Sequence, residues 1–253
     1  MNIDLQLTVQ RFGENVEVLR VYPLGDLHVG SEQFNHERFQ KWLDIVKKDQ
    51  QGVVVLVGDM LDNGLKNSKT NSYEQLRPRE QKRLLVDYLG QIESKILAVV
   101  QGNHEYRSTY LTDHCPLYDA LVMLDLEELY RENFGFLKLA LGKKNHERQF
   151  AYTFALAHGK TKNKNEKFGV AIDGMDVFIT GHTHQPYSTF PAKIVIDPRN
   201  ETVSQKGYVH ISVPSFLDFG GYALRDMYLP QDNEKFPVIE LSGTKKEVKV
   251  IWR

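Results

Sequence analysis

The sequence predicts an α/β protein in which two sheets are flanked by helices. In the first half of the chain, short apolar runs rich in Val, Ile and Leu alternate with longer segments of helical period. In the second half, strand-like runs follow one another with little helix between them. A chain of 253 residues can bury a substantial core, so we expect one domain spanning residues 1–253.

The first half follows the order β-α-β-α-β-α. Its expected strands are the apolar runs at 16–24, 53–57 and 96–100. A helix is expected at 34–48, and others within 74–93 and within 116–131. The first of these helices carries one apolar stripe, formed by Phe39, Trp42, Leu43 and Val46. In the second half, the expected strands are 136–141, 151–158, 176–180, 193–197, 208–213, 236–241 and 247–252.

Composition and charge exclude several classes of protein. With 41% hydrophobic and 26% charged residues, the chain has the composition of an ordinary folded protein. A net charge of −1 argues against a nucleic-acid-binding surface over the whole chain, and runs such as 53–57 are too short to span a bilayer. Cys115 is the single cysteine, and the N-terminal residues lack the pattern of a signal peptide. We therefore expect a cytoplasmic protein with no internal disulfide.

Five of the expected strands end in polar residues that can bind metals or transfer protons. These endings are 25-GDLHVG-30, 58-GDMLDNG-64, 102-GNHE-105, 157-AHGK-160 and 181-GHTH-184. Any one of them could be a turn or a helix cap, because Asp, Asn and Gly are common there. In an open α/β sheet, functional groups gather at the carboxyl ends of strands, so five such endings favour one shared site.

The residue types in these endings indicate a hydrolytic metal site. Asp and His donors with no thiolate nearby suit manganese, iron, zinc or nickel. Two such ions about 3.5–4 Å apart can activate a hydroxide and bind both the attacking and the leaving oxygen of a phosphoryl group.

Taken in order, the motifs DxH, GDxxD, GNH(D/E), an isolated His and GHxH resemble the signature of the calcineurin-like metallophosphoesterase superfamily. The resemblance runs from about Leu24 to His184 and says little about the residues after about 190. It implies a four-layer αββα sandwich of two mixed sheets flanked by helices, with a dinuclear metal site at the edges of the sheets.

The resemblance also implies a role for each residue of the motifs. One divalent ion would be bound by Asp26, His28 and His184, and the other by Asn103, His158 and His182, with Asp59 as the bridge. Manganese is the expected metal, and iron, zinc and nickel are the alternatives. His104 would face the substrate and protonate the leaving oxygen, while Asp62 would orient its imidazole. An acid–base histidine needs such a carboxylate to fix its tautomer and raise its basicity.

Two positions depart from other branches of the superfamily. Purple acid phosphatases have a tyrosine ligand three residues after the bridging Asp, where this chain has Asp62. Serine/threonine protein phosphatases have a phosphate-binding Arg where this chain has Asn63. The resemblance is therefore to the phosphodiesterase and nuclease branch.

Two segments concentrate basic charge. Residues 138–167 contain eight Lys or Arg against two Glu, and residues 66–83 contain six against two. The lysines that follow the motifs are Lys160, Lys162, Lys164 and Lys167 after His158, and Lys66 and Lys69 after Asp62. These side chains could bind a polyanionic backbone at the rim of the site, or they could lie on solvated loops.

Three functional hypotheses remain open. The first is a two-metal phosphodiesterase that acts on DNA, RNA or a nucleotide. The second is a phosphomonoesterase that acts on nucleotides or phosphoproteins. The third is a non-catalytic scaffold subunit with this fold, although all seven candidate metal positions hold suitable donors. No membrane partner is expected, and the oligomeric state is left open.

Overall fold

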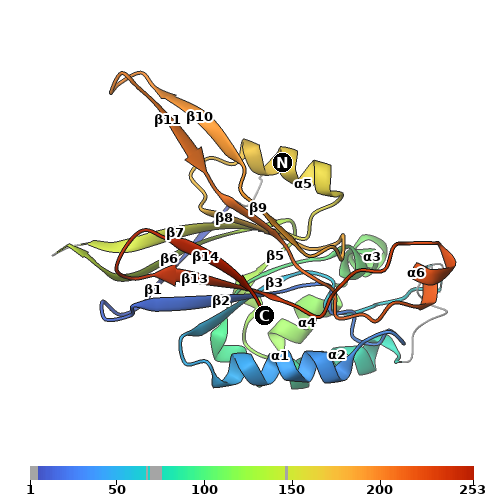
Figure 1. Cartoon of the computed structure of the whole chain (residues 1–253). Coiled ribbons are helices and arrows are strands. Elements are labelled where there is room, and N and C mark those ends of the chain that lie inside the picture. The colour runs from blue at the N-terminus through green and yellow to red at the C-terminus, as the bar shows by residue number, and fades with distance from the viewer. Residues whose placement is uncertain (1–4, 67, 69–75, 146–147) are drawn as a thin grey trace.

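Two six-stranded sheets lie face to face in the computed structural model, which describes residues 5–66, 68, 76–145 and 148–253. Helices α1 (His36–Lys48), α2 (Pro78–Leu89) and α4 (Pro116–Val122) lie below one sheet, and α5 (Lys162–Ala171) lies above the other (Figure 1). The predicted fold class, an α/β sandwich of two mixed sheets flanked by helices, is confirmed. Within these ranges, no helix has both the length and the apolar character needed to cross a membrane.

The sheet next to α1, which we call the β2 sheet, has the strand order β14-β13-β2-β3-β4-β5. Its strands are β2 (Val18–Leu24), β3 (Gly52–Val57), β4 (Ile96–Val100), β5 (Tyr130–Arg131), β13 (Pro237–Ser242) and β14 (Val248–Trp252). Strands β2 to β5 are parallel, and all of β3 is buried, because helices cover one face of the sheet and the second sheet covers the other. The strands predicted at 16–24, 53–57, 96–100, 236–241 and 247–252 are all found here.

The second sheet, which we call the β7 sheet, has the strand order β1-β6-β7-β8-β12-β9. Its strands are β1 (Leu7–Arg11), β6 (Phe134–Asn145), β7 (Arg148–Ala157), β8 (Val177–Thr180), β9 (Tyr187–Thr189) and β12 (Val209–Ser212). Strands β7, β8 and β12 are parallel, so their carboxyl ends meet at one edge of the sheet. The strands predicted at 136–141, 151–158, 176–180 and 208–213 are confirmed, whereas β9 was not predicted.

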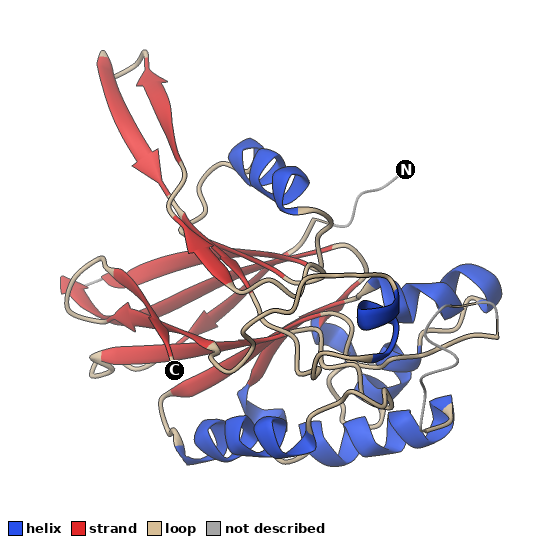
Figure 2. Cartoon of the chain, turned by 45° about the vertical axis from the view of Figure 1, so that its right-hand side comes forward, coloured by secondary structure: helices blue, strands red, loops and turns tan. Residues whose placement is uncertain are grey.

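The helices divide into those that the sequence pattern predicts and those that it does not. Helices α1, α2 and α4 lie within the predicted spans, and α1 begins at His36 because the Asn35 side chain accepts a hydrogen bond from the backbone N–H of Arg38. The short helix η3 (Glu127–Leu129) also lies within the predicted span 116–131. The unpredicted elements are α3 (Asn103–Thr112), α5, α6 (Gly221–Arg225) and η2 (Glu93–Lys95). In Figure 2 the helices lie mostly below and to the right of the strands, with α5 alone above them.

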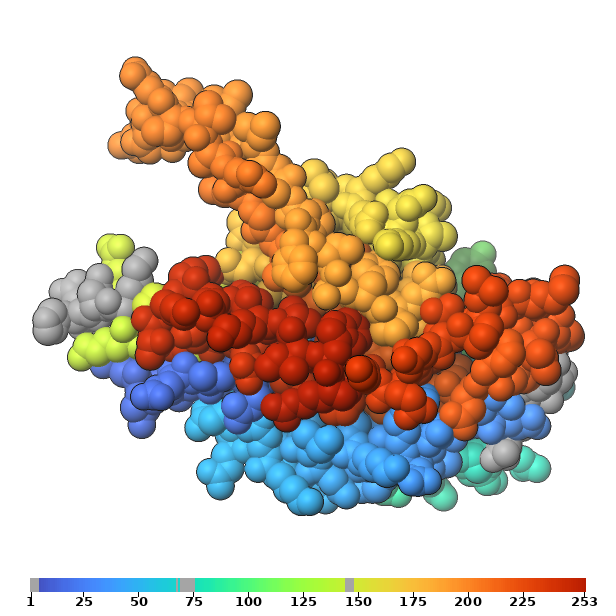
Figure 3. Space-filling model, viewed as in Figure 1, coloured from blue at the N-terminus to red at the C-terminus, as the bar shows by residue number. Residues whose placement is uncertain are grey.

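A two-stranded ribbon projects from the body of the protein (Figure 3). It pairs β10 (Ala192–Asp197) with β11 (Thr202–Gly207), so the strand predicted at 193–197 belongs to neither large sheet. Ile194, Ile196 and Val203 lie on one face of the ribbon, because cross-strand partners and alternate residues share a face. Their side chains are 69–76% exposed, so this apolar face is open to solvent.

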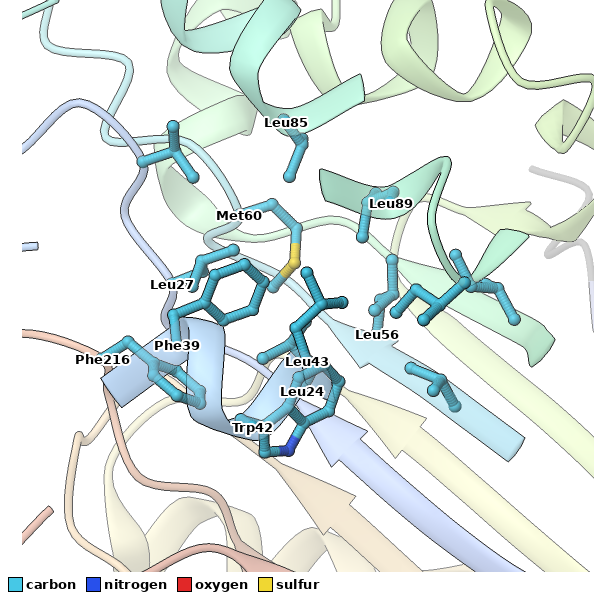
Figure 4. Close-up of a cluster of buried hydrophobic side chains, with 14 of the residues drawn as sticks. Leu24, Leu27, Phe39, Trp42, Leu43, Leu56, Met60, Leu85, Leu89 and Phe216 are labelled. Atoms are coloured by element: carbon cyan, nitrogen blue, oxygen red, sulfur yellow. The ribbon is translucent and has the colours of Figure 1, made fainter. Parts of the chain in front are cut away.

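The largest apolar cluster lies between the β2 sheet and its helices (Figure 4). Within it, Phe39 stacks on Trp42 with ring centroids 5.8 Å apart. Leu27 and Met60, the residues that directly follow Asp26 and Asp59, are also buried in this cluster. The core therefore anchors the two loops that carry these carboxylates. A second apolar cluster fills the space between the two sheets, and a smaller one lies between the β7 sheet and α5.

A polar network ties the end of α1 to the β2 sheet. Asp49, which follows α1, accepts hydrogen bonds from Arg20 Nη2 and from the hydroxyl of Tyr22, each at 2.7 Å. Burial alone would raise the pKa of Asp49, but these bonds to the ionised carboxylate outweigh it and lower the pKa to about 2. The charged form of Asp49 is thus favoured by folding.

We expect Asp49→Asn to destabilise the protein at neutral pH by about 1–2 kcal/mol, because hydrogen bonds to a charged group are lost. Since folding lowers the pKa, the contribution of Asp49 is fully present above the ordinary value near 4 and is lost as the pH falls toward 2. Urea unfolding between pH 2 and pH 7 measures both effects. Asp87→Asn, which alters an exposed carboxylate on α2, is the control, and equal pH dependence in both variants would contradict the prediction.

Candidate metal centre

The five polar strand endings lie at carboxyl ends of parallel strands in both sheets. In the β2 sheet, Asp26 follows β2, Asp59 follows β3 and Asn103 follows β4. In the β7 sheet, His158 follows β7, and the GHTH motif at 181–184 follows β8. The structure brings all seven sequence-predicted ligands together where the edges of the two sheets meet.

The first group of donors consists of Asp26, His28 and His184. The Nε2 atoms of His28 and His184 are 3.1 Å apart, and Asp26 Oδ1 lies 3.4 Å from His184 Nε2 and 4.0 Å from His28 Nε2. Asp26 and His28 are buried, whereas His184 is partly exposed. The group therefore opens toward solvent on the side of His184.

The second group consists of Asn103, His158 and His182. Asn103 Oδ1 lies 3.0 Å from His158 Nε2 and 2.6 Å from His182 Nδ1. His158 Nδ1 is 2.8 Å from the carbonyl oxygen of Val57, and this hydrogen bond directs Nε2 into the group. Asp59 lies between the two groups, with Oδ2 at 3.1 Å from His158 Nε2 and 3.9 Å from His28 Nε2.

The electrostatic field of these groups favours a cation. Burial disfavours charge on His158, but Asp59 and Asp26 outweigh burial and raise the pKa of its imidazole to about 10. Burial lowers the pKa of His28 to about 4, so this ring is neutral and has a lone pair to donate. Buried carboxylates that stabilise a proton on His158 also stabilise a metal ion in its place, because metal binding displaces protons from its ligands. The donor set therefore fits divalent metal ions.

The loops that carry the donors hold a strained backbone. Five of the seven candidate ligands have positive φ angles between 50° and 70°, namely Asp26, His28, Asp59, His182 and His184. Residues other than glycine rarely adopt this left-handed conformation, which costs on the order of 1 kcal/mol or more at each position. Tertiary contacts therefore hold these loops in a backbone conformation that their own residues disfavour. One such contact is the backbone N–H of His182, which donates to both carboxylate oxygens of Asp26 at 3.0 and 2.9 Å and so links the two sheets.

Two glycines allow the loops after β3 and β4 to approach each other. A Cβ at Gly58 would lie 2.6 Å from the Cα of Gly102, and Gly58 also has a φ of +86°. A Cβ at Gly102 would overlap the backbone N and the carboxylate of Asp59. The glycines of GDxxD and GNHE are therefore required by backbone contact as well as by turn geometry.

Glu105 has a structural role that the sequence analysis did not assign. Its buried carboxylate accepts hydrogen bonds from the backbone N–H groups of Asp59, Leu61 and Gly102, at 3.0–3.1 Å. Burial raises the pKa of Glu105 to about 7. Only the tertiary arrangement reveals this role, because the three donors belong to two loops more than 40 residues apart in sequence. Glu105 braces the loops of Asp59 and Asn103 against each other.

His104 lies beside the donors, with Nε2 3.8 Å from Asp59 Oδ2. Its Nδ1 is 2.6 Å from the backbone carbonyl oxygen of Asp62 and 3.5 Å from Asp62 Oδ1. The family resemblance implies that the Asp62 carboxylate orients the ring, whereas the structure puts the Asp62 carbonyl oxygen at hydrogen-bond distance. A carbonyl can only accept, so Nδ1 carries the proton of the neutral ring. The Asp62 carboxylate lies 3.4 Å from His28 Nδ1.

Arg107 and Tyr222 are two further residues near the centre that the sequence analysis did not assign. Arg107 lies one turn after His104 on α3, and its Nη2 is 2.9 Å from His104 Nε2. Tyr222 lies on α6, and burial together with the charge of Asp62 and Asp59 raises the pKa of its hydroxyl to about 12. Neither residue belongs to a strand ending, so no motif identified them.

Some of the lysines identified in the sequence lie near the donor groups, and others lie farther away. Lys160 is exposed two residues after His158, and Lys162 Nζ lies 4.8 Å from the centroid of the Tyr187 ring, three residues beyond His184. Lys164 and Lys167 are exposed farther along α5, and Lys66 is exposed on the loop after Asp62. Lys69 falls outside the described residues. The lysine-rich segment after His158 is thus a helix rather than a loop.

Comparison with known proteins identifies the class. Residues 19–186 match the family model of calcineurin-like phosphoesterases, and the chain belongs to this family. Membership indicates a metal-dependent hydrolase, in agreement with the buried His and Asp groups. Comparison with curated protein sequences finds no match.

Comparison with solved structures finds several similar chains at low sequence identity. One is a metallophosphoesterase from Sphaerobacter thermophilus, with 13% identity, a TM-score of 0.45, and coverage of 93% of this chain and 88% of that chain. Another is the calcineurin-like phosphoesterase YfkN from Bacillus subtilis, with 11% identity, a TM-score of 0.42, and coverage of 94% and 90%. A third is Vps29 from Chaetomium thermophilum, with 12% identity, a TM-score of 0.41, and coverage of 93% and 97%.

We expect Glu105→Ala to destabilise the protein by about 3 kcal/mol or more, because three buried N–H groups lose their acceptor. The variant should also bind Mn²⁺ more weakly, since the loops of Asp59 and Asn103 lose their brace. Urea unfolding and metal analysis of the purified protein measure the two effects. Glu105→Gln keeps one acceptor oxygen and should lose less of both, whereas an alanine variant with unchanged stability and metal content would show that the brace is unimportant.

Proposed function

We propose that this chain is a dinuclear metal-dependent phosphodiesterase. The observation that carries the proposal is the position of the Asp59 carboxylate between two groups of nitrogen and oxygen donors. A shared carboxylate of this kind can bridge two neighbouring metal ions. The imidazoles of His28 and His158 beside Asp59 are buried, and their pKa values are shifted from the ordinary value. Such shifts are common where side chains bind metals or transfer protons.

In this proposal, one divalent ion would be held by Asp26, His28 and His184, and the other by Asn103, His158 and His182. Such ions would activate water and stabilise negative charge on the phosphoryl oxygens. Manganese is the proposed metal, because carboxylate, amide and imidazole donors without a thiolate suit it, and iron, zinc and nickel also fit this donor set. The carbonyl of Val57 keeps His158 in the orientation that metal binding requires.

His104 is the proposed acid that protonates the leaving oxygen. The bond from its Nδ1–H to the Asp62 carbonyl fixes the ring, so Nε2 is the nitrogen that can meet a substrate. Burial lowers the pKa of His104 to about 4, while the charge of Asp59 acts in the opposite direction. A bound phosphate anion would add to the effect of Asp59 and favour the protonated ring that the reaction needs.

A phosphodiester is the proposed substrate class. Asn63, at the position of the phosphate-binding Arg of protein phosphatases, is buried, and its amide donates to the His104 carbonyl and the Ser108 hydroxyl. The loop after β3 therefore presents no cation there, and a diester monoanion needs less positive charge than a monoester dianion. The exposed Lys160 and Lys162 favour a polyanion such as DNA or RNA over a small nucleotide.

The other two hypotheses make different demands on this site. A non-catalytic scaffold has no need of a complete donor set, whereas here all seven donors are present and converge. A phosphomonoesterase would use the same metal centre, so substrate preference has to separate it from a diesterase.

Hydrolysis of bis-p-nitrophenyl phosphate and of p-nitrophenyl phosphate, each with Mn²⁺, tests the substrate class. We expect kcat/KM to be at least about tenfold higher for the diester, because an uncharged ester group replaces one phosphate oxygen and less cationic charge is required. A preference for the monoester would favour the phosphomonoesterase. Failure to hydrolyse either compound, with fewer than one metal ion bound per chain, would favour the scaffold.

Cleavage of single-stranded and duplex DNA at several salt concentrations tests the polymer substrate. We expect the apparent affinity for DNA to fall as salt rises, and Lys160→Ala combined with Lys162→Ala to make that fall shallower. Lys41→Ala, which removes an exposed lysine of α1, is the matched control. Equal salt dependence in the double variant and in the parent would argue against a lysine rim.

We expect His104→Ala to lower turnover by about 10²- to 10⁴-fold, the usual contribution of a proton-transferring group. Metal content should stay at two ions per chain, because His104 contacts Asp59 through its backbone N–H at 2.8 Å, and alanine keeps that bond. Steady-state kinetics and metal analysis give the two readouts, with His36→Ala on the surface of α1 as the control. Loss of metal in the His104 variant would refute its assignment as the acid.

A further inference from the structure

Asn63 stands in the loop after β3 where protein phosphatases have a phosphate-binding arginine, and helix α3 carries Arg107 close to His104. Asn63 uses its amide within the protein, on the His104 carbonyl and the Ser108 hydroxyl. Arg107 lies on the face of α3 that bears His104, and its Nη2 is 2.9 Å from His104 Nε2. His104 Nε2 in turn lies 3.8 Å from Asp59 Oδ2, so the guanidinium lies close to the donor groups.

We propose that Arg107 binds a non-bridging phosphate oxygen of the substrate, and that this contact replaces its hydrogen bond to His104 Nε2. The inference rests on the proposed function, because it assigns a substrate-binding residue to that same site. It places one phosphate-binding arginine on α3 instead of on the loop after β3, and one guanidinium matches the single negative charge of a diester.

The hydrogen-bonding roles of the two side chains show why Arg107 would leave His104 for a phosphate oxygen. A guanidinium can only donate, so His104 Nε2 accepts from Arg107 and carries no proton in this arrangement. A phosphate oxygen is a stronger acceptor for a guanidinium than a neutral imidazole, since the bond is then between opposite charges. Substrate binding therefore draws Arg107 away from His104.

The half-buried position of Arg107 suits this role. Its neighbours on α3, Tyr106 and Tyr110, are more than half exposed, whereas His104 and Glu105 are buried. Arg107 thus lies at the boundary between solvent and the donor groups. Its planar group can bind two oxygens of one phosphate, which a lysine cannot do in the same geometry.

Binding of inorganic phosphate to the full-length, Mn²⁺-loaded protein tests the inference directly. Isothermal titration calorimetry on Arg107→Ala should show phosphate affinity reduced by about 10- to 100-fold, the loss expected for a charged hydrogen bond, with metal content unchanged. KM for bis-p-nitrophenyl phosphate should rise along with the dissociation constant. Arg107→Lys should recover part of the affinity, because it restores the charge without the paired donors.

A second comparison separates substrate binding from mere support of His104. In a His104→Ala background, Arg107→Ala should still weaken phosphate binding by a similar factor, because the proposed contact is to the anion. If the arginine only holds His104 in place, its removal will have no further effect in that background. Arg199→Ala is the control, because it removes an exposed arginine from the turn between β10 and β11. It should change neither the phosphate affinity nor KM.

Several results would overturn the inference. Phosphate affinity and KM within twofold of the parent in a folded, metal-loaded Arg107→Ala protein would do so, as would no phosphate binding by the parent at millimolar concentration. If the alanine variant does not fold, Arg107→Lys and Arg107→Gln provide the same comparison. If the parent binds phosphate through Arg107 but hydrolyses no ester, the proposed function fails while the anion site stands.

Discussion

The buried carboxylate of Asp59 is the centre on which the rest of the site depends. A carboxylate that is 1% exposed is costly unless hydrogen bonds and opposite charges compensate it. Here the backbone N–H of His104 donates to Oδ1 at 2.8 Å, and His158 lies 3.1 Å from Oδ2. Glu105 in turn holds the backbone N–H of Asp59 itself. The contacts that compensate the buried charge of Asp59 therefore also form a site that can bind cations.

Assembly of the site depends on the packing of the two sheets. The β2 sheet contributes Asp26, Asp59 and Asn103, and the β7 sheet contributes His158 and the two histidines of the GHTH motif. The apolar cluster between the sheets keeps these two edges side by side, and so does the hydrogen bond from the backbone N–H of His182 to Asp26. Ions that bind donors from both sheets would stabilise this packing in turn, because they favour the folded state that presents all the donors. Strained loops can persist there because both sheets fix them.

Much of the fold followed from the sequence, because apolar periodicity and strand endings are local signals. The strands of the β2 sheet and α1 were of this kind, and the strand endings together with the family resemblance predicted the seven donors. Helices α3 and α5 were missed, since neither has an apolar stripe, and α5 falls within a run of lysines. The contact of Arg107 with His104 is local to α3 and was missed because that helix was not predicted. The brace formed by Glu105 and the use of the Asp62 carbonyl rather than its carboxylate depend on tertiary geometry. No spacing of residues in the sequence carries that information.

Anomalous diffraction from crystals soaked in Mn²⁺ would test the central claim most directly. The account predicts two metal peaks about 3.5–4 Å apart, with a carboxylate oxygen of Asp59 within bonding distance of both. One peak would lie among Asp26, His28 and His184, and the other among Asn103, His158 and His182. A single peak, or ions bound without contact to Asp59, would contradict the dinuclear centre and the hydrolytic function proposed from it.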